Sequence, residues 1–253
     1  MSAFVLKMIA IISMTFDHTG YLVFGEFSYF NYIGRLAFPI FAFQISQGYT
    51  HTKNLTKYFS RLCIFAIISQ VPFMLFLYSS NTVIPISKIP STLYSLITTG
   101  NPTLNIFFTL AIGLAAIMVF DKIKYKSLGI LVGISFAFLG HYINVDYGFY
   151  GVIIILLFYL FRNNKLIMAL SFILVTVLNY IRLVWSLYTN FYSKGIDISG
   201  YITTYVILCI CTMLSLFCIC LYNGKKGRNT KRLLYFFYPI HLLLIYFCFL
   251  MFS

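Results

Sequence analysis

Residues 4–24 read FVLKMIAIISMTFDHTGYLVF, a run apolar enough to cross a bilayer that nevertheless carries Asp17 and His18 in its second half. The next apolar run, residues 29–49, carries Arg35. A charge at membrane depth costs at least about 2.5–3.5 kcal/mol, so it needs a partner or a hydrated cavity. Asp17 and Arg35 lie at nearly equal distances from the short connection between the two runs. A helical hairpin would bring them to one depth, where they can pair beside an imidazole that titrates near neutrality.

Composition places the whole chain in the membrane. Of its 253 residues, 61% are apolar and only 9% are charged, and the mean hydropathy is +0.92. Soluble domains average about 25% charged residues. The first apolar run is long and lacks a small-residue cleavage pattern, so we interpret it as a retained helix rather than a signal peptide. We therefore expect an all-α, polytopic transmembrane helix bundle, forming a single integral domain over residues 1–253 in the cell (plasma or inner) membrane.

Nine apolar segments are predicted to be membrane-crossing helices. They cover residues 4–24, 29–50, 57–79, 103–120, 127–140, 146–161, 165–186, 200–222 and 233–252. The longest connection, residues 79–102, is rich in Ser, Thr, Asn and Pro and is expected outside the cell. The fifth and sixth segments are short, so one of them is expected to be tilted or re-entrant.

Basic residues are sorted between alternate connections. Fourteen of the eighteen Lys and Arg residues lie near the N-terminus or in the even-numbered connections. They are Lys7, Lys53, Lys57, Arg61, Lys122, Lys124, Lys126, Arg162, Lys165, Lys225, Lys226, Arg228, Lys231 and Arg232. The odd-numbered connections keep only Lys88 and Lys194. By the positive-inside rule the N-terminus is cytoplasmic and the C-terminus is outside. The net charge of +13 thus reflects orientation in the bilayer, and no nucleic-acid partner is expected.

The six cysteines do not suggest a metal site. All lie inside apolar runs, and neither a CxxC pair nor a Cys/His ligand spacing occurs. We interpret them as small packing residues, and no metal is expected.

The charged pair and the histidines are the candidate catalytic residues. In one interpretation, Asp17 and Arg35 only fix the hairpin, while His18 bonds to a neighbouring helix. In the other, His18 is a general base whose orientation and local field are set by Asp17 and Arg35. His241, in the last segment, is an alternative base because it lies nearer the cytoplasmic side.

A second set of polar residues is predicted to bind substrate or to stabilise an oxyanion. Their positions place them toward the outer side: Gln70, Asn105, His141, Asp146 and Arg182. Tyr147 and Tyr150 are interpreted as aromatic anchors at the membrane interface. Pro39 falls within the second segment, where proline frees a backbone carbonyl and kinks a helix.

Several motifs together resemble the TraX family over essentially the full chain, most densely in the first 75 residues. They are Asp17-His18-Thr19-Gly20-Tyr21, Gly34-Arg35-Leu36-Ala37-Phe38-Pro39, Ser69-Gln70-Val71-Pro72-Phe73, Asn105-Ile106-Phe107-Phe108, Asp146-Tyr147-Gly148-Phe149-Tyr150-Gly151 and Tyr238-Pro239-Ile240-His241. The resemblance implies an inner-membrane protein tied to acetylation of a conjugative pilin, with acetyl-CoA as the acyl donor. Gln47 and Gln70 depart from the family, because relatives often have Glu at these positions.

We therefore expect a membrane acyltransferase that moves an acetyl group from acetyl-CoA to an amine or hydroxyl. The acceptor would be a pilin-like peptide or a glycan that is exported or lies at the membrane. Two alternatives use the same features. A proton-coupled transporter or flippase would use the buried charges as a relay. A non-catalytic assembly factor for a pilus or for conjugation would need only a partner.

Overall fold

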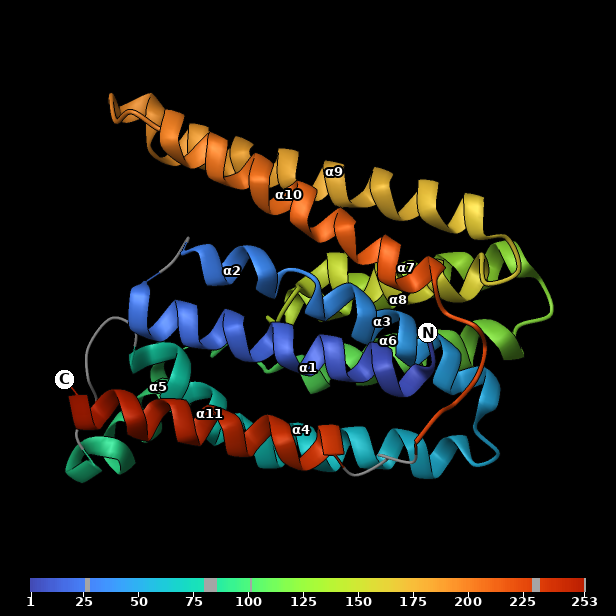
Figure 1. Cartoon of the computed structure of the whole chain (residues 1–253), viewed down its shortest axis with the longest axis horizontal. Coiled ribbons are helices and arrows are strands. Elements are labelled where there is room, and N and C mark those ends of the chain that lie inside the picture. Colours follow the sequence, from blue (N-terminus) through green and yellow to red (C-terminus); the bar gives the residue numbers. More distant parts are fainter. Residues whose placement is uncertain (26–27, 80–85, 101, 229–232, 253) are drawn as a thin grey trace.

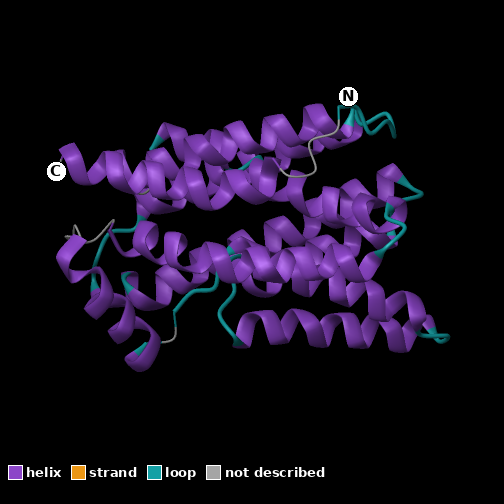
Figure 2. Ribbon diagram, turned by 90° about the horizontal axis from the view of Figure 1, so that it is seen from below, coloured by secondary structure: helices purple, strands orange, loops and turns teal. Residues whose placement is uncertain are grey.

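The computed structural model describes residues 1–25, 28–79, 86–100, 102–228 and 233–252. Within these ranges the chain forms helices joined by turns and loops and contains no strand, apart from one isolated bridge between Leu104 and Val145 (Figure 2). The longer helices run side by side along the long axis of the molecule (Figure 1). The predicted all-α class is confirmed.

Most of the helices lie in the segments that were predicted from the sequence. The first half contains α1 (Ala3–Thr19), a π-helical turn η1 (Gly20–Phe24), α2 (Tyr29–Gly34), α3 (Ala37–His51), α4 (Leu55–Ser79), a 3₁₀ turn η2 (Ile86–Lys88) and α5 (Ile89–Thr99). The second half contains α6 (Ile106–Lys122), α7 (Lys126–Tyr142), α8 (Gly148–Leu160), α9 (Lys165–Asn190), the 3₁₀ turn η3 (Tyr192–Lys194), α10 (Ser199–Cys220) and α11 (Leu233–Phe252). Helix α5 was missed because its proline signalled a loop, but Pro90 lies in the first turn, where proline is tolerated.

Three of the described helices, α4, α9 and α10, are each long and apolar enough to cross a bilayer. Helices α9 and α10 leave much of their apolar surface uncovered, including Leu174, Ile181 and Phe217. Lipid is the medium in which such a surface is stable. The chain is therefore a membrane protein, whereas the count of nine spans and the direction of the N-terminus stay predictions.

Helix α3 lies at the centre of the bundle, where it packs against α1, α6 and α8, and α6 packs against α7 and α8. Glycines bring these helices together, since a side chain at Gly113 of α6 would collide with Ile155 of α8. The same holds for Gly133 of α7 and Leu156 of α8. In lipid the hydrophobic effect does not drive helices together, so close packing and internal hydrogen bonds must stabilise the bundle.

The connections rich in Lys and Arg gather at the end of the bundle that holds the N-terminus (Figure 1). Hydrogen bonds tie this end together. The backbone N–H of Ala3 donates to the carbonyl of Lys225 (2.8 Å), and Lys165 Nζ donates to the carbonyl of Cys220 (3.1 Å). The hydroxyls of Tyr49 and Tyr159 both donate to the Asp121 carboxylate, at 2.8 and 2.9 Å. The charge sorting seen in the sequence thus corresponds to one physical end of the molecule.

Candidate functional site

The predicted pairing of the first two apolar runs is present. Arg35 Nη2 donates to Asp17 Oδ1 at 2.8 Å, and the two side chains are only 28% and 17% exposed. The guanidinium Nε also donates to the carbonyl of Asn31 at 3.4 Å. A partly buried acid and a partly buried base at this distance satisfy each other and neutralise the charge that the bilayer would otherwise penalise.

Both helices leave α-geometry where these charges lie. Helix α1 passes into a π-helical turn just after His18, and π-turns inside helices occur frequently at functional sites. The second apolar run breaks at Arg35 and Leu36, so that α2 ends and α3 begins there. Pro39 consequently lies in the first turn of α3 and not in mid-helix, where a kink was expected. Proline fits a first turn because the N–H that it lacks would be unpaired there in any case.

Asn31 is a site residue that sequence reasoning missed. Its amide Nδ2 donates to the Asp17 carboxylate at 3.2 Å and to the Asp17 backbone carbonyl at 3.0 Å. Its Oδ1 accepts from the backbone N–H and the hydroxyl of Ser28, which closes the first turn of α2. Gly34 lies directly against Asp17, where any side chain would collide with the carboxylate. The small residue therefore permits the close approach that the ion pair needs.

The two candidate bases meet at the same level of the bundle. His18 Nδ1 and His241 Nε2 are 2.7 Å apart, and their ring planes differ by only 15°. His241 is 4% exposed, and its Nδ1 lies 2.9 Å from the backbone carbonyl of Phe237. From the sequence, His18 and His241 were alternative candidates for the general base. In the structure they contact each other and so connect α1 with α11.

Aromatic rings surround the imidazole pair. The ring of Phe76 lies 4.8 Å from that of His18, and the buried Tyr238 lies 6.2 Å from His18 and 5.5 Å from His241, between ring centroids. His18 also interacts electrostatically with Arg35. Because Asp17 and His18 are neighbours in the sequence, the ion pair and the imidazole pair lie next to each other in the bundle.

Asp146 joins this site from the turn between α7 and α8. Its backbone N–H donates to the carbonyl of Leu104 (2.7 Å), and its own carbonyl accepts from the hydroxyl of Thr109. The Asp146 carboxylate interacts electrostatically with Arg35 and Asp17. Of the residues predicted to bind substrate, Asp146 is thus brought to the charged cluster.

Tyr147 contributes to the site in a way that the sequence did not indicate. It has a positive φ of 61°, which is a strained conformation for a bulky residue and is found mainly at functional sites. Its ring stacks on Phe38 with centroids 3.8 Å apart and planes 11° from parallel. It also interacts electrostatically with Arg35. An interfacial anchor was expected here, but the ring is held by protein.

Gln70 and Asn105 form a hydrogen-bonded unit between α4 and the start of α6. Gln70 Oε1 accepts from the backbone N–H of Asn105 (3.1 Å) and from its Nδ2 (2.8 Å), while Gln70 Nε2 donates to the carbonyl of Thr103 (2.9 Å). Asn105 Nδ2 also donates to the carbonyl of Ala66 (2.7 Å), and its Oδ1 caps α6 at Phe107. Both amide protons of Asn105 are therefore engaged, whereas one amide proton of Gln70 has no partner among the residues that the structure describes.

His141 and Arg182 are not brought to the cluster. His141 is exposed at the end of α7. Arg182 is exposed on α9, where its Nη2 contacts Asn179 Oδ1 of the preceding turn at 3.4 Å. Any role of these two residues with a substrate would be at the surface.

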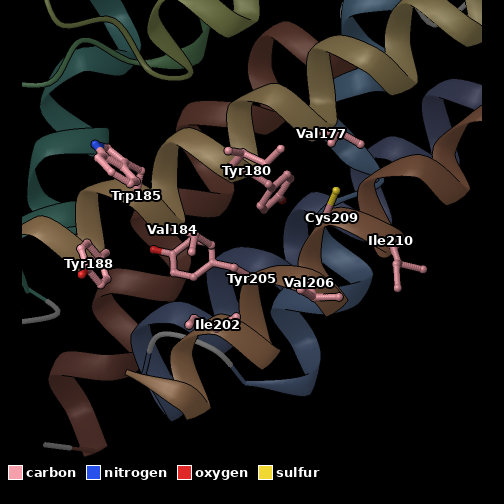
Figure 3. Close-up of a pocket in the computed structure, with 11 residues that line it drawn as sticks. Val177, Tyr180, Val184, Trp185, Tyr188, Ile202, Tyr205, Val206, Cys209 and Ile210 are labelled. Atoms are coloured by element: carbon pink, nitrogen blue, oxygen red, sulfur yellow. The ribbon is translucent and has the colours of Figure 1, made fainter. Parts of the chain in front are cut away.

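A cavity of about 500 Å³ opens between α9 and α10 (Figure 3). Its lining is almost entirely apolar and comes from these two helices: Val177, Tyr180, Ile181, Val184, Trp185, Tyr188, Ile202, Tyr205, Val206, Cys209 and Ile210. The hydroxyl of Tyr180, one of the lining residues, hydrogen-bonds with the Thr212 hydroxyl (2.9 Å). None of the predicted catalytic residues lines this cavity.

Fold and site together define an all-helical membrane protein with an ion pair and a histidine pair in its apolar interior. The chain belongs to the TraX family, since the family profile described as TraX protein matches residues 2–248. The family resemblance noted in the motifs is thus confirmed.

Comparison with curated proteins gives one similar relative, the "Probable fimbrial assembly protein FimC, serogroup H1" of Dichelobacter nodosus. It is 30% identical over 258 residues, which cover 96% of this chain and 94% of the relative. No solved structure matches the chain.

Proposed function

We propose that this TraX-family protein is a membrane acyltransferase. It would transfer an acyl group, most simply acetyl from acetyl-CoA, to an amine or hydroxyl of a pilin-like peptide or a glycan. The relative named for fimbrial assembly supports an acceptor that belongs to a surface fibre or its assembly.

The observation that carries the proposal is the contact between the partly buried His18 and the buried His241 beside the Asp17–Arg35 ion pair. Imidazole is the most common general base in enzymes because it exchanges a proton near neutral pH. A polar cluster of this kind is costly inside a membrane protein, and such clusters mark functional sites there. An ion pair alone would fix the hairpin without needing two histidines from opposite ends of the chain.

The chemistry requires one proton to move and return. As the acceptor's nitrogen or oxygen bonds to the thioester carbonyl carbon, its proton passes to an imidazole nitrogen. The carbon–sulfur bond then breaks, and the leaving thiolate takes that proton back. The acyl acceptor and free coenzyme A are the products, and the histidine returns to its starting state. General base catalysis of this kind contributes roughly 10²- to 10⁴-fold in rate.

The negative charge that develops on the carbonyl oxygen needs donors near the imidazoles. Arg35 is the charged candidate, although its tight contact with Asp17 means that the two would act as a unit. The remaining amide proton of Gln70 and the Tyr147 hydroxyl are neutral candidates. Preorganised donors in a water-poor site stabilise such an oxyanion far more than they would in water.

The donor would approach from the end of the bundle that holds the connections rich in Lys and Arg (Figure 1), whose positive charge would attract the phosphates of coenzyme A. The acceptor would approach from the opposite end, where α2 begins and α9 ends. The polar cluster between these ends is where the thioester and the acceptor would meet.

The test uses protein purified in lipid nanodiscs with acetyl-labelled acetyl-CoA and short peptides or glycan fragments as acceptors. Wild-type protein is expected to release free coenzyme A and to label an acceptor. His18→Ala is expected to lose at least about 10²-fold of this rate. His51→Ala is the matched control, because His51 is exposed at the end of α3. Wild-type turnover in both His18→Ala and His241→Ala would exclude histidine base catalysis.

The relative's name favours a second candidate, a non-catalytic assembly factor. Such a protein would bind its partner equally well with His18→Ala and would not turn over acetyl-CoA. Proton-coupled uptake by reconstituted protein, without turnover, would instead support a transporter.

A further inference from the structure

We propose that His18 is the base, acting through an unprotonated Nε2, and that His241 is the positioning residue that holds His18 in this tautomer. The proposal rests on the acyltransferase function above, but it concerns the protonation of two named nitrogens. It can therefore be tested whether or not acyl transfer is found.

The argument begins at His241 Nδ1, which lies 2.9 Å from the backbone carbonyl oxygen of Phe237. A carbonyl oxygen can only accept, so His241 Nδ1 must carry the proton. Phe237 is four residues earlier in the same helix, so this contact depends only on α11. In neutral His241 the other nitrogen, Nε2, is then bare and can only accept.

The next bond in the chain is the 2.7 Å contact between His241 Nε2 and His18 Nδ1. Because His241 Nε2 can only accept, His18 Nδ1 must donate and must carry a proton. Neutral His18 then has a bare Nε2. Within the described parts of the chain no hydrogen bond involves His18 Nε2, which leaves it free to take a proton from a substrate.

The ring geometry supports a true hydrogen bond here. The ring planes are nearly parallel, at 15°, and the centroids are 5.0 Å apart. The distance between the centroids exceeds the 2.7 Å distance between the nitrogens by about two ring radii. The two nitrogens therefore lie on the line that joins the two ring centres, in the planes of the rings. An in-plane approach of this kind is the direction in which an imidazole N–H donates and an imidazole lone pair accepts.

His241 would also share the charge formed during the reaction. When His18 Nε2 takes a proton, His18 becomes an imidazolium whose Nδ1–H points at the lone pair of His241. That proton can move toward His241 Nε2 and spread the positive charge over both rings. In serine hydrolases a buried carboxylate orients the catalytic histidine and stabilises its imidazolium; here a neutral imidazole would do so.

The experiment uses ¹⁵N-histidine-labelled protein in nanodiscs and reads the protonation of each ring nitrogen by NMR. The chain has only four histidines, so His51→Gln and His141→Gln variants assign the spectrum. The proposal predicts that near neutral pH His18 and His241 are both protonated at Nδ1 and bare at Nε2. It also predicts an NMR spin–spin coupling between the nitrogen nuclei of His18 Nδ1 and His241 Nε2, transmitted across the hydrogen bond.

Two variants separate positioning from folding. His241→Ala removes the acceptor, so His18 is expected to lose its single tautomer and populate both. His241→Gln supplies a side-chain oxygen that can accept from His18 Nδ1, so the wild-type tautomer is expected to return. Gln cannot take a proton, so acyl transfer by His241→Gln is expected to recover only in part, at least 10-fold above His241→Ala, with an altered pH–rate profile.

A wild-type protein with His18 protonated at Nε2 would overturn the proposal. So would a His18 tautomer that is unchanged in the His241→Ala variant. If the tautomers are as predicted but no acyl transfer is found, the hydrogen-bonded arrangement of the two histidines stands, while the acyltransferase function and the role of His18 as its base both fail.

Discussion

His18 and His241 are separated by 223 residues, yet their Nδ1 and Nε2 atoms lie 2.7 Å apart. The contact joins the first and last helices of the chain. Next to it, Asp17 uses its carboxylate for Arg35 and Asn31, so the hydrogen bond that orients His18 comes from His241 and not from its neighbour in sequence. The site therefore depends on the complete bundle.

The first prediction concerns the ion pair. Asp17→Ala leaves a buried guanidinium without its carboxylate, and Arg35→Ala leaves the reverse. Each is expected to lower the free energy of unfolding, by less than the roughly 3–5 kcal/mol lost when a fully buried pair is broken, because the two side chains are 28% and 17% exposed. The double variant is expected to lose clearly less than the sum of the two. Unfolding in detergent micelles measures all four proteins, and strictly additive effects would show that the two side chains do not interact.

The close approach of α1 and α2 gives a second prediction. Gly34→Ala places a methyl group against the Asp17 carboxylate and is expected to destabilise the protein by about 1–3 kcal/mol. Gly200→Ala is the matched control, because nothing lies within 4 Å of a side chain there and alanine favours a helix. Equal stability of the two variants in thermal unfolding would contradict this packing.

The hydrogen bonds of Gln70 give a third prediction. The amide must both accept from Asn105 and donate to the Thr103 carbonyl. A carboxylate cannot donate, so Gln70→Glu is expected to destabilise the protein by about 1–3 kcal/mol at pH 8. Acidification is expected to restore part of this loss, because a protonated carboxyl can donate. A stability difference from wild type that is unchanged between pH 8 and pH 5 would argue against the assigned bonds.

The fourth prediction concerns pH at the basic end. Hydrogen bonds from Tyr49 and Tyr159, with nearby Lys126 and Arg162, lower the pKa of the Asp121 carboxyl below its ordinary value of 3.8. A carboxyl whose pKa is lower when folded contributes stability above its unfolded pKa and loses it as the pH falls through the folded pKa.

Asp121→Asn is therefore expected to be less stable than wild type at pH 7, with the difference shrinking below about pH 4. Thermal unfolding from pH 7 to pH 3 measures it. Asp197→Asn is the comparison for an aspartate without tyrosine partners, because local hydrogen bonds from Ser199 and Ile198 lower the pKa of the exposed Asp197 carboxyl. A constant difference across this range would mean that Asp121 gains nothing from its tyrosine partners.

Much of the fold followed from hydrophobic runs, because a bilayer imposes long apolar segments whose ends can be read directly. The pairing of Asp17 with Arg35 was predictable for a related reason: equal spacing from a short connection sets equal depth. Helix α5 was not predicted because a proline such as Pro90 is equally typical of the first turn of a helix and of a loop, so the sequence alone does not separate the two.

The rest of the site could not be read from local pattern. The contact of His18 with His241 depends on how the last helix packs against the first, and no spacing rule covers 223 residues. Asn31 looked like an ordinary polar residue near a helix start, and only the fold shows its bonds to Asp17. Tyr147 matched an interfacial aromatic, and its left-handed backbone and its stack on Phe38 are visible only in three dimensions.

The most direct measurement compares intact masses of exported peptides and surface glycans from cells that carry wild-type protein, His18→Ala or His51→Ala. The account predicts that one polymer or peptide carries the added mass of an acetyl group in wild-type and His51→Ala cells and lacks it in His18→Ala cells. The same acetyl increment in all three strains, with His18→Ala protein present at wild-type level, would contradict it.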